Sequence, residues 1–254
     1  MEETTSLQTR FWPWSLASIT LIFLIWYAIT TTGYIRPIFL PSPASTMEAL
    51  WELLISGVFL KALLISFMRI AVATIFAVVL GVILGFSMGL SKKIESFFRP
   101  ITEPLRYLPI TAILPLLILW FGIGETMKVI FLFLGIVFYF IPFVSNTVRS
   151  TPHIYLDVAK SFGAKKLGIL IKRVYWPHAL PKIFDVLIVI NGIGWTYVIL
   201  AEIINARDGL GYLINIAGRL QKSDEVFAGL ILIAVVAIGS DHILRHIRNK
   251  YFFW

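Results

Sequence analysis

The chain has 254 residues, of which 58% are hydrophobic and 14% are charged, and its mean hydropathy is +0.86. This composition excludes an ordinary soluble domain and predicts an all-α membrane protein. The net charge of +8 follows the loops on one side of the membrane, so nucleic acid is not expected as a partner. Cysteine is absent, which excludes disulfides and thiolate metal sites.

Six apolar runs are long enough to cross a hydrocarbon core of about 30 Å. The run that includes Pro109 and Pro115 is short, so we expect a kinked or broken helix there. The first run follows Arg10 but lacks a convincing cleavage site, so we expect an uncleaved first span. The six predicted transmembrane helices centre on 16–34, 60–90, 105–121, 127–144, 183–204 and 226–244.

The loop after the first run predicts a further, interfacial helix. Pro41-Ser42-Pro43 ends one element, and Ser45 with Glu48 forms a capping-box pattern. We expect an amphipathic helix at about 45–56 that lies in the outer interface and braces the bundle. Its apolar face would consist of Met47, Leu50, Trp51, Leu54 and Ile55.

The second run carries a small residue at every fourth position. Such spacing predicts a seam where helix backbones approach closely. The sequence leaves open whether the seam packs against this chain or a second one. Its members are Ala73, Ala77, Gly81, Gly85 and Gly89.

The distribution of Lys and Arg predicts the topology. If the N-terminus is cytoplasmic, 15 of the 22 Lys and Arg residues face the cytoplasm, six face outward and Arg69 lies within a span. Both termini and the basic insert at 151–181 are therefore expected in the cytoplasm. The insert would begin with an N-cap at Thr151, stop at Gly163 and form a second short helix until Pro177 and Pro181 break it. Two short helices at an angle would form a docking element.

Polar residues at membrane depth are the candidate residues of a translocation path, because burying them costs free energy unless they are paired or line a water-filled cavity. We expect Arg69 to snorkel outward and Asp185 to form an interfacial pair near Lys182. Asn191 and Trp195 share a helix face, for which a translocation-path role and ordinary interhelical hydrogen bonding both remain open. Asn146 and Glu202 complete this set.

The residues do not indicate an enzyme. The segment closest to a phosphate-binding loop, Gly163 to Gly168, lacks the Lys-Ser/Thr pair that holds phosphate and Mg²⁺. His242 and His246 lie one turn apart, but at a predicted cytoplasmic helix end where cations are favoured without a metal. We therefore expect no catalytic residue, no metal and no resident cofactor.

Several motifs resemble one transporter family. Asp157-x-Ala159, Gly163, Pro177 and Ala179-Leu180-Pro181 resemble the "EAA" loop of ABC-importer permeases, although Asp157-Val158-Ala159 stands where that family has Glu-Ala-Ala. The likeness extends from about residue 15 to about 247 and is similar to the nitrate, sulfonate, taurine and bicarbonate branch. It also rests on Leu40-Pro41-Ser42-Pro43, the run from Pro115 to Glu125, Asn146-Thr147, Ala201-Glu202 and Gly209-Leu210-Gly211.

The resemblance implies a single permease domain over 1–254 with the type I importer fold, in a bacterial inner membrane. It implies a cytoplasmic ATPase dimer, a second permease copy forming a homodimer, an extracytoplasmic substrate-binding protein and membrane lipid as partners, and alternating access as the mechanism. Glu202 would act as a gate or loop brace, paired with a cation such as Arg207. ATPase coupling would fall to Asp157, Ala159, Lys160, Phe162, Gly163, Ala164, Lys165 and Lys166, and the path or gate to Asn146, Asn191, Trp195 and Glu202.

Two other function classes are weighed against this one. A secondary transporter driven by an ion gradient would need ionisable groups at mid-membrane and usually an internal repeat. A membrane enzyme would need clustered acids, bases or metal ligands. The sequence has few ionisable groups at mid-membrane and no recognisable internal repeat. It has no cluster of acids, bases or metal ligands.

Overall fold

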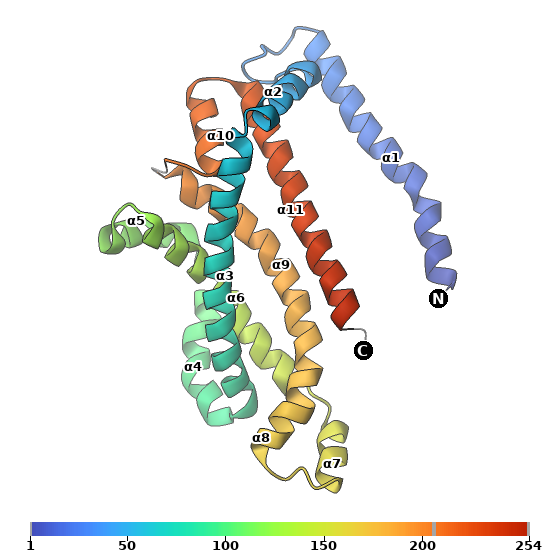
Figure 1. Cartoon of the computed structure of the whole chain (residues 1–254), viewed down its shortest axis with the longest axis vertical. Helices are drawn as coiled ribbons and strands as arrows, with labels where there is room; N and C mark the ends of the chain where they lie inside the picture. Colours follow the sequence, from blue (N-terminus) through green and yellow to red (C-terminus); the bar gives the residue numbers. More distant parts are fainter. Residues whose placement is uncertain (1, 205–206, 253–254) are drawn as a thin grey trace. The chain divides into compact units, whose positions relative to one another are not determined.

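The computed structural model describes the backbone of residues 2–204 and 207–252 and the side chains of 14, 16–204 and 207–252. The regular elements in these ranges are all helical (Figure 1). They fall into two compact units, Met1–Leu60 with Leu213–Leu232, and Lys61–Tyr212 with Ile233–Trp254.

Four helical stretches in the described residues are long and apolar enough to cross a membrane, and a bent helix pair would make five. They are Val58–Leu90, Glu125–Arg149, Leu167–Ile203 and Ser223–Tyr251. The first predicted run corresponds to the apolar part of α1, Leu16–Thr31, which is shorter. The all-α class is thus confirmed, and the count of six spans stays a prediction.

The first unit contains α1 (Glu2–Thr31), α2 (Pro43–Ile55), most of α10 (Leu210–Arg219) and the start of α11 (Ser223–Tyr251). The indole N–H of Trp26 donates to the carbonyl of Pro41 at 2.9 Å, and its ring stacks on Phe227 with centroids 6.0 Å apart. These contacts fasten the loop after α1 to α11.

The interfacial helix predicted at 45–56 is α2, but it begins earlier than expected. Ser42, not Ser45, is the N-cap, and its side chain accepts the N–H of Ser45 at 3.1 Å. The reason is Pro43, whose fixed φ suits the first helical position and whose missing N–H costs nothing there. Four of the five residues of the expected apolar face are exposed, namely Met47, Trp51, Leu54 and Ile55.

In the second unit, the small-residue seam of α3 (Val58–Leu90) packs on α6 (Glu125–Arg149) of the same chain. A Cβ added at Gly85 would lie 2.6 Å from Cβ of Val144, and one at Gly89 would lie 2.6 Å from Cβ of Val148. Gly81 faces Phe140 in the same way. The question that the sequence left open is therefore answered: the three glycines let α3 approach α6 within one subunit.

The predicted break in the third run is confirmed. α4 (Lys92–Leu105) and α5 (Ile110–Phe121) meet at an angle of 99°, and Figure 1 shows α5 turned away from α4. Pro109 is the N-cap of α5, and it disfavours helical geometry in the residue before it. The sequence did not predict α4 as a helix of its own, because it begins in a polar segment before the run.

Beyond α6 the chain forms α7 (His153–Ser161), the single turn α8 (Leu167–Leu170), a π-helical segment η1 (Ile171–Tyr175) and α9 (Trp176–Ile203). The expectation that Pro177 and Pro181 end a short helix is wrong, because the helix continues from Leu167 to Ile203. The π segment changes the hydrogen-bond register just before Pro177, which then occupies the first turn of α9, where a missing N–H is tolerated.

Helix α6 lies at the centre of the second unit, where it contacts α4, α5 and α9. Phe131, Leu132, Ile136 and Phe140 are fully buried along it. Gly135 lets α9 approach, since a Cβ there would lie 2.6 Å from the ring of Tyr197.

Candidate functional site

The second unit contains a buried ion-pair cluster centred on Arg69 of α3. The side chain of Arg69 is only 3% exposed. Its Nε and Nη2 donate to the two carboxylate oxygens of Glu125 at 2.6 Å each, and Nη1 donates to Oε1 of Glu202 at 2.7 Å. The remaining N–H groups reach the carbonyl and Oδ1 of Asp208 at 3.2 and 2.5 Å. All five guanidinium donors are thus satisfied.

Glu202, near the end of α9, is fully buried. Besides Arg69, it accepts the hydroxyl of Ser66 at 2.8 Å and the backbone N–H of Gly211 at 2.8 Å. Ser66 in turn accepts the N–H of Leu210 at 2.9 Å. Arg69, Ser66 and Gly211 thus satisfy the Glu202 carboxylate inside the protein, and the residue serves as a structural anchor for the elements around it.

Two glycines let the loop before α10 close over Glu202. Gly209 has φ +102, and a Cβ on it would collide with the carboxylate of Glu202. At Gly211 a Cβ would lie 2.6 Å from the carbonyl oxygen of Ile199. The Gly-x-Gly spacing therefore serves close approach of the backbone to a buried charge.

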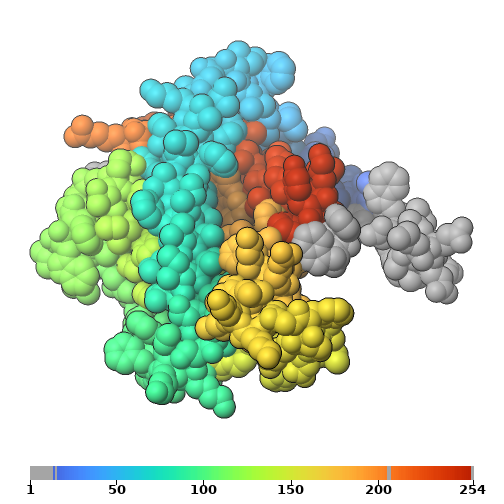
Figure 2. Space-filling view, turned by 60° about the horizontal axis from the view of Figure 1, so that its bottom comes forward, coloured from blue at the N-terminus to red at the C-terminus, as the bar shows by residue number. Residues whose placement is uncertain are grey.

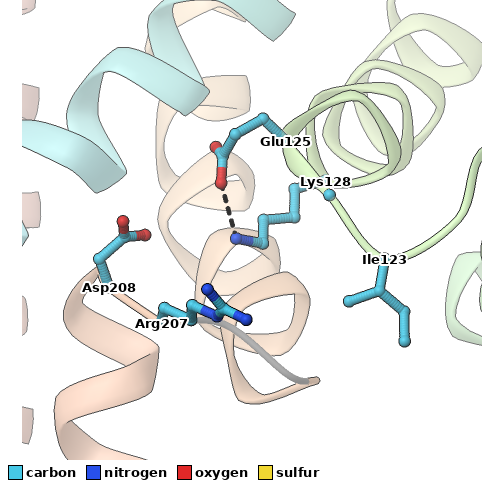
Figure 3. Close-up of a pocket in the computed structure, with 6 residues that line it drawn as sticks. Ile123, Glu125, Lys128, Arg207 and Asp208 are labelled. Carbon is cyan, nitrogen blue, oxygen red and sulfur yellow. Dashed lines mark hydrogen bonds and ion pairs between the residues drawn. The ribbon is translucent and has the colours of Figure 1, made fainter.

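A cavity of about 480 Å³ opens beside the cluster. Lys128, with a side chain 5% exposed, donates to Glu125 at 2.7 Å, and Figure 3 shows this pair facing Arg207 and Asp208. The lining combines cationic and anionic groups and therefore has no strong preference of sign. Its residues are Ile123, Gly124, Glu125, Lys128, Arg207 and Asp208.

This geometry corrects one predicted environment and two predicted partners. Arg69 does not snorkel outward but is buried, and Glu202 pairs with Arg69 rather than Arg207. Asp185 pairs with Arg248 of α11 at 2.8 Å, not with Lys182. For both acids the sequence pointed to a cation nearby in the chain, whereas folding brought a distant one closer. The cluster members Ser66, Lys128 and Asp208 were not singled out as site residues, and Glu125 appeared only as the last residue of a motif that carries the family resemblance.

The other predicted path residues lie apart from this cluster. Asn191 and Trp195 share a face, as expected, and donate to the hydroxyl of Ser240 on α11 at 2.8 and 3.0 Å. This is the interhelical bonding that was weighed against a path role. Asn146 is exposed on α6.

The predicted stop at Gly163 is confirmed in detail. Gly163 has φ +87, its N–H bonds to the carbonyl of Lys160 at 2.9 Å, and the N–H of Ala164 bonds to the carbonyl of Ala159 at 3.0 Å. This pair of bonds is a Schellman motif, which requires the left-handed conformation that glycine adopts readily. The predicted N-cap is not seen, because Pro152 precedes α7 and the buried hydroxyl of Thr151 has no hydrogen-bond partner.

The predicted coupling residues divide into two groups. Ala159 and Ala164 lie half-buried against Leu156, Leu170 and Val174. The others are exposed: Asp157, Lys160, Phe162, Gly163, Lys165 and Lys166, with Phe162 exposing 88% of its surface. Figure 2 shows the segment from α7 to α8 projecting at the surface of the second unit.

Comparison with known proteins decides the family. The family model described as "binding-protein-dependent transport system inner membrane component" matches residues 77–252. The chain belongs to this family. The permease is 33% identical over 248 residues to the taurine transport system permease protein TauC of Escherichia coli (strain K12), covering 94% of this chain and 89% of the relative.

Two other relatives extend the comparison. The permease is 32% identical to the putative aliphatic sulfonates transport permease protein SsuC of Bacillus subtilis (strain 168), over 96% of this chain and 88% of the relative. It is 34% identical to the riboflavin transport system permease protein RibX of Chloroflexus aurantiacus, over 92% of this chain and 87% of the relative. The predicted sulfonate and taurine branch is thus confirmed.

Solved structures agree on the fold. The chain matches a structure of the MetNI methionine ABC transporter with a TM-score of 0.67 and 16% identity, over 77% of this chain and 97% of that one. It matches a bacterial ABC transporter involved in alginate import with a TM-score of 0.67 and 15% identity, over 97% of this chain and 99% of that one. The protein is a multi-pass inner-membrane permease of an ABC importer, and the alternative of a secondary transporter has no support in these comparisons.

Proposed function

We propose that the permease forms one half of the pore of an importer for a small anionic solute, with a sulfonate such as taurine as the first candidate and nitrate or bicarbonate within the same class. The printed substrates of two relatives support this choice. The riboflavin relative supplies the competing cargo, a larger heterocycle. Uptake of labelled taurine, and its competition by an alkanesulfonate but not by riboflavin, separates the two.

The observation that carries the coupling proposal is the exposed turn after α7. Phe162 projects from a Schellman turn whose backbone is held by two hydrogen bonds. A cytoplasmic ATPase subunit would therefore bind its side chain without unfolding the segment. Lys160, Lys165 and Lys166 surround it with positive charge, and Ala159 and Ala164 hold the turn to α8 and η1. In this proposal Ala159 and Ala164 support the turn that contacts the ATPase and do not touch the ATPase themselves.

The energy source lies on the partner. The segment from Gly163 to Gly168, which comprises part of the turn after α7 and the first residues of α8, has no Lys-Ser/Thr pair to hold a nucleotide, so ATP would be bound by an ATPase dimer. The chain would act as one permease domain over 1–254, paired with a second copy, with both termini in the cytoplasm and a substrate-binding protein outside.

The ion-pair cluster would make the bundle move as one piece. It joins α3, the start of α6, the end of α9 and the loop before α10 through charged hydrogen bonds. In alternating access, ATP binding would draw the two exposed turns together, and each bundle would rotate rigidly around the path. Glu202 acts in this proposal as a brace of the outer gate, without touching cargo.

Co-purification tests the proposal. The tagged full-length chain, extracted in mild detergent, should retain an ATPase subunit, and the complex in proteoliposomes should take up taurine only with ATP and the binding protein. Phe162→Ala should lower ATPase retention, while Ile169→Ala, on the adjacent exposed turn of α8, should not. Purification of an active, ATP-independent transporter would overturn the proposal.

A further inference from the structure

Helix α6 has one exposed stripe on an otherwise buried surface. Of the four candidate spans it is the most buried. Beyond its first turn the exposed residues are Tyr139, Phe143, Asn146 and Arg149, spaced i, i+4, i+7 and i+10, so they lie on one face. A central helix that leaves a stripe with a phenol and an amide uncovered is unlike a lipid-facing helix, which is apolar throughout.

The break between α4 and α5 lies beside this stripe. Glu95 of α4 pairs with Arg149, and Arg106, at the end of α4, lies within electrostatic range of Tyr139. The eleven residues from Glu95 to Arg106 span about 16 Å, and the ten from Tyr139 to Arg149 span about 15 Å. The two helices therefore run antiparallel, and the break lies near the middle of α6. Arg106, which the charge count grouped with the cytoplasmic residues, lies at this level instead.

Non-helical backbone at this depth cannot face lipid, because its peptide groups would lose hydrogen bonds without any from water. Residues 106–109 form such a segment, and Tyr107 is 73% exposed. The segment must therefore be covered by protein or line a water-filled cavity. A hollow of about 630 Å³ already begins at its edge, lined by Ser96, Arg99, Pro100, Glu103, Pro104 and Tyr107.

Arg106 places a positive charge at the break. Its guanidinium lies 4.6 Å from the ring centroid of Tyr107 and donates to the hydroxyl of that residue. The nearest acid along the helix, Glu103, is engaged by Arg99 at 2.9 Å. Among the described residues no carboxylate lies within ion-pair distance of Arg106, so donors remain for an anion from solution. This differs from Arg69, whose donors are all satisfied inside the protein.

We propose that the stripe of α6 and the α4–α5 break line the translocation path, and that Arg106 is the cation that attracts the negative group of the cargo at mid-membrane. A guanidinium presents paired N–H groups that match a sulfonate or carboxylate. Tyr107 would hold the guanidinium in place through its ring and hydroxyl. This inference rests on the proposed anionic cargo and adds the residues that would recognise its charge.

Thiol labelling tests the path without needing cargo, transport or ATP hydrolysis. The chain has no cysteine, so Tyr139→Cys and Asn146→Cys each introduce its single thiol, and labelling of the permease reports on that position. Each variant, in membrane vesicles containing the assembled complex, is treated with an anionic reagent, 2-sulfonatoethyl methanethiosulfonate, and a cationic one, 2-(trimethylammonium)ethyl methanethiosulfonate. Rates are divided by those of a free thiol in solution. Ile75→Cys and Phe76→Cys are the controls, because both positions are 61% exposed on α3 but have only apolar neighbours along that face.

Both stripe cysteines should react and the α3 controls should not. At Tyr139→Cys, the stripe position nearest to Arg106, the anionic reagent should be favoured on the order of tenfold by that single charge. Arg106→Gln should abolish this preference while labelling continues, and Arg106→Lys should retain most of it. Any effect of Arg106 on the thiol itself cancels in the ratio of the two reagents.

Two results would overturn the inference. Stripe cysteines as unreactive as the α3 controls would show that the stripe is sealed from water. Reactive cysteines with no anionic preference, or with one that survives Arg106→Gln, would remove Arg106 from charge selection. Neither result depends on α7, so failure here and failure of ATPase coupling are distinguishable.

Discussion

Arg69 and Glu202, separated by 133 positions in the chain, form a 2.7 Å ion pair in which both side chains are buried. Such a pair adds little net stability when complete, but replacing one member leaves buried hydrogen-bonding groups without their charged partner. The pair therefore makes the N-terminal part of α3 and the C-terminal end of α9 interdependent, and the first prediction follows from this asymmetry.

Glu202→Gln should lower the free energy of unfolding by about 1–3 kcal/mol, because the amide NH2 group cannot accept the hydrogen bonds that Arg69, Ser66 and Gly211 donate to the carboxylate. The melting temperature of the purified protein in detergent measures this. Asp241→Asn, which removes an exposed i,i+4 pair with Arg245, is the control and should leave the melting temperature unchanged. Equal effects of the two variants would contradict a special role for the cluster.

Gly211→Ala should destabilise the protein by about 1–3 kcal/mol through steric overlap, since the added methyl group meets the carbonyl of Ile199 and the side chain of Glu202. Gly192→Ala is the matched control, because no atom lies within 4 Å of its added Cβ. That variant should be neutral or slightly stabilising. Thermal unfolding of both proteins side by side tests the close approach seen in the structure.

Gly85→Leu should reduce the yield of folded protein, because the side chain would have to displace Val144 and the backbone of α6. Gly239→Leu, on α11 with open space around it, should be expressed normally. Size-exclusion chromatography of detergent extracts reports the folded fraction. A normal, monodisperse Gly85→Leu protein would mean that α3 and α6 do not meet along this seam.

Gly163→Leu should uncouple ATP hydrolysis from uptake while leaving the protein inserted. The φ of +87 is strained for leucine, and the larger side chain would hold a partner away from Phe162. Gly168→Leu, which has no positive φ and equal space, serves as the control. The ratio of substrate transported to ATP hydrolysed is the measurement, and an unchanged ratio in Gly163→Leu would count strongly against coupling through this turn.

A topology test is independent of the family. A cysteine replacing Lys166 should react with a membrane-impermeant thiol reagent only from the cytoplasmic side, and one replacing Lys222 only from outside. Labelling in sealed right-side-out and inside-out vesicles gives the answer. Outside labelling at position 166 would invert the topology and leave the turn at Gly163 without an ATPase to meet.

The sequence alone determined the features that depend on neighbours along the chain. Apolar length predicted the membrane character, Pro109 and Pro115 predicted the broken run, and Gly163 predicted the end of α7. The four-residue spacing of small residues predicted a packing seam. Each follows from a local rule about hydropathy, backbone freedom or helical period.

Tertiary structure alone decided the partners of the charges. From the sequence, Lys182 and Arg207 were the closest cations to Asp185 and Glu202, yet the structure pairs these acids with Arg248 and Arg69. Likewise, the continuation of the helix past Pro177 depended on a π segment that has no clear pattern in the sequence. A buried charge takes whichever opposite charge the packing of helices brings within hydrogen-bond distance, and helix packing is set by side-chain shape over the whole bundle rather than by separation along the chain.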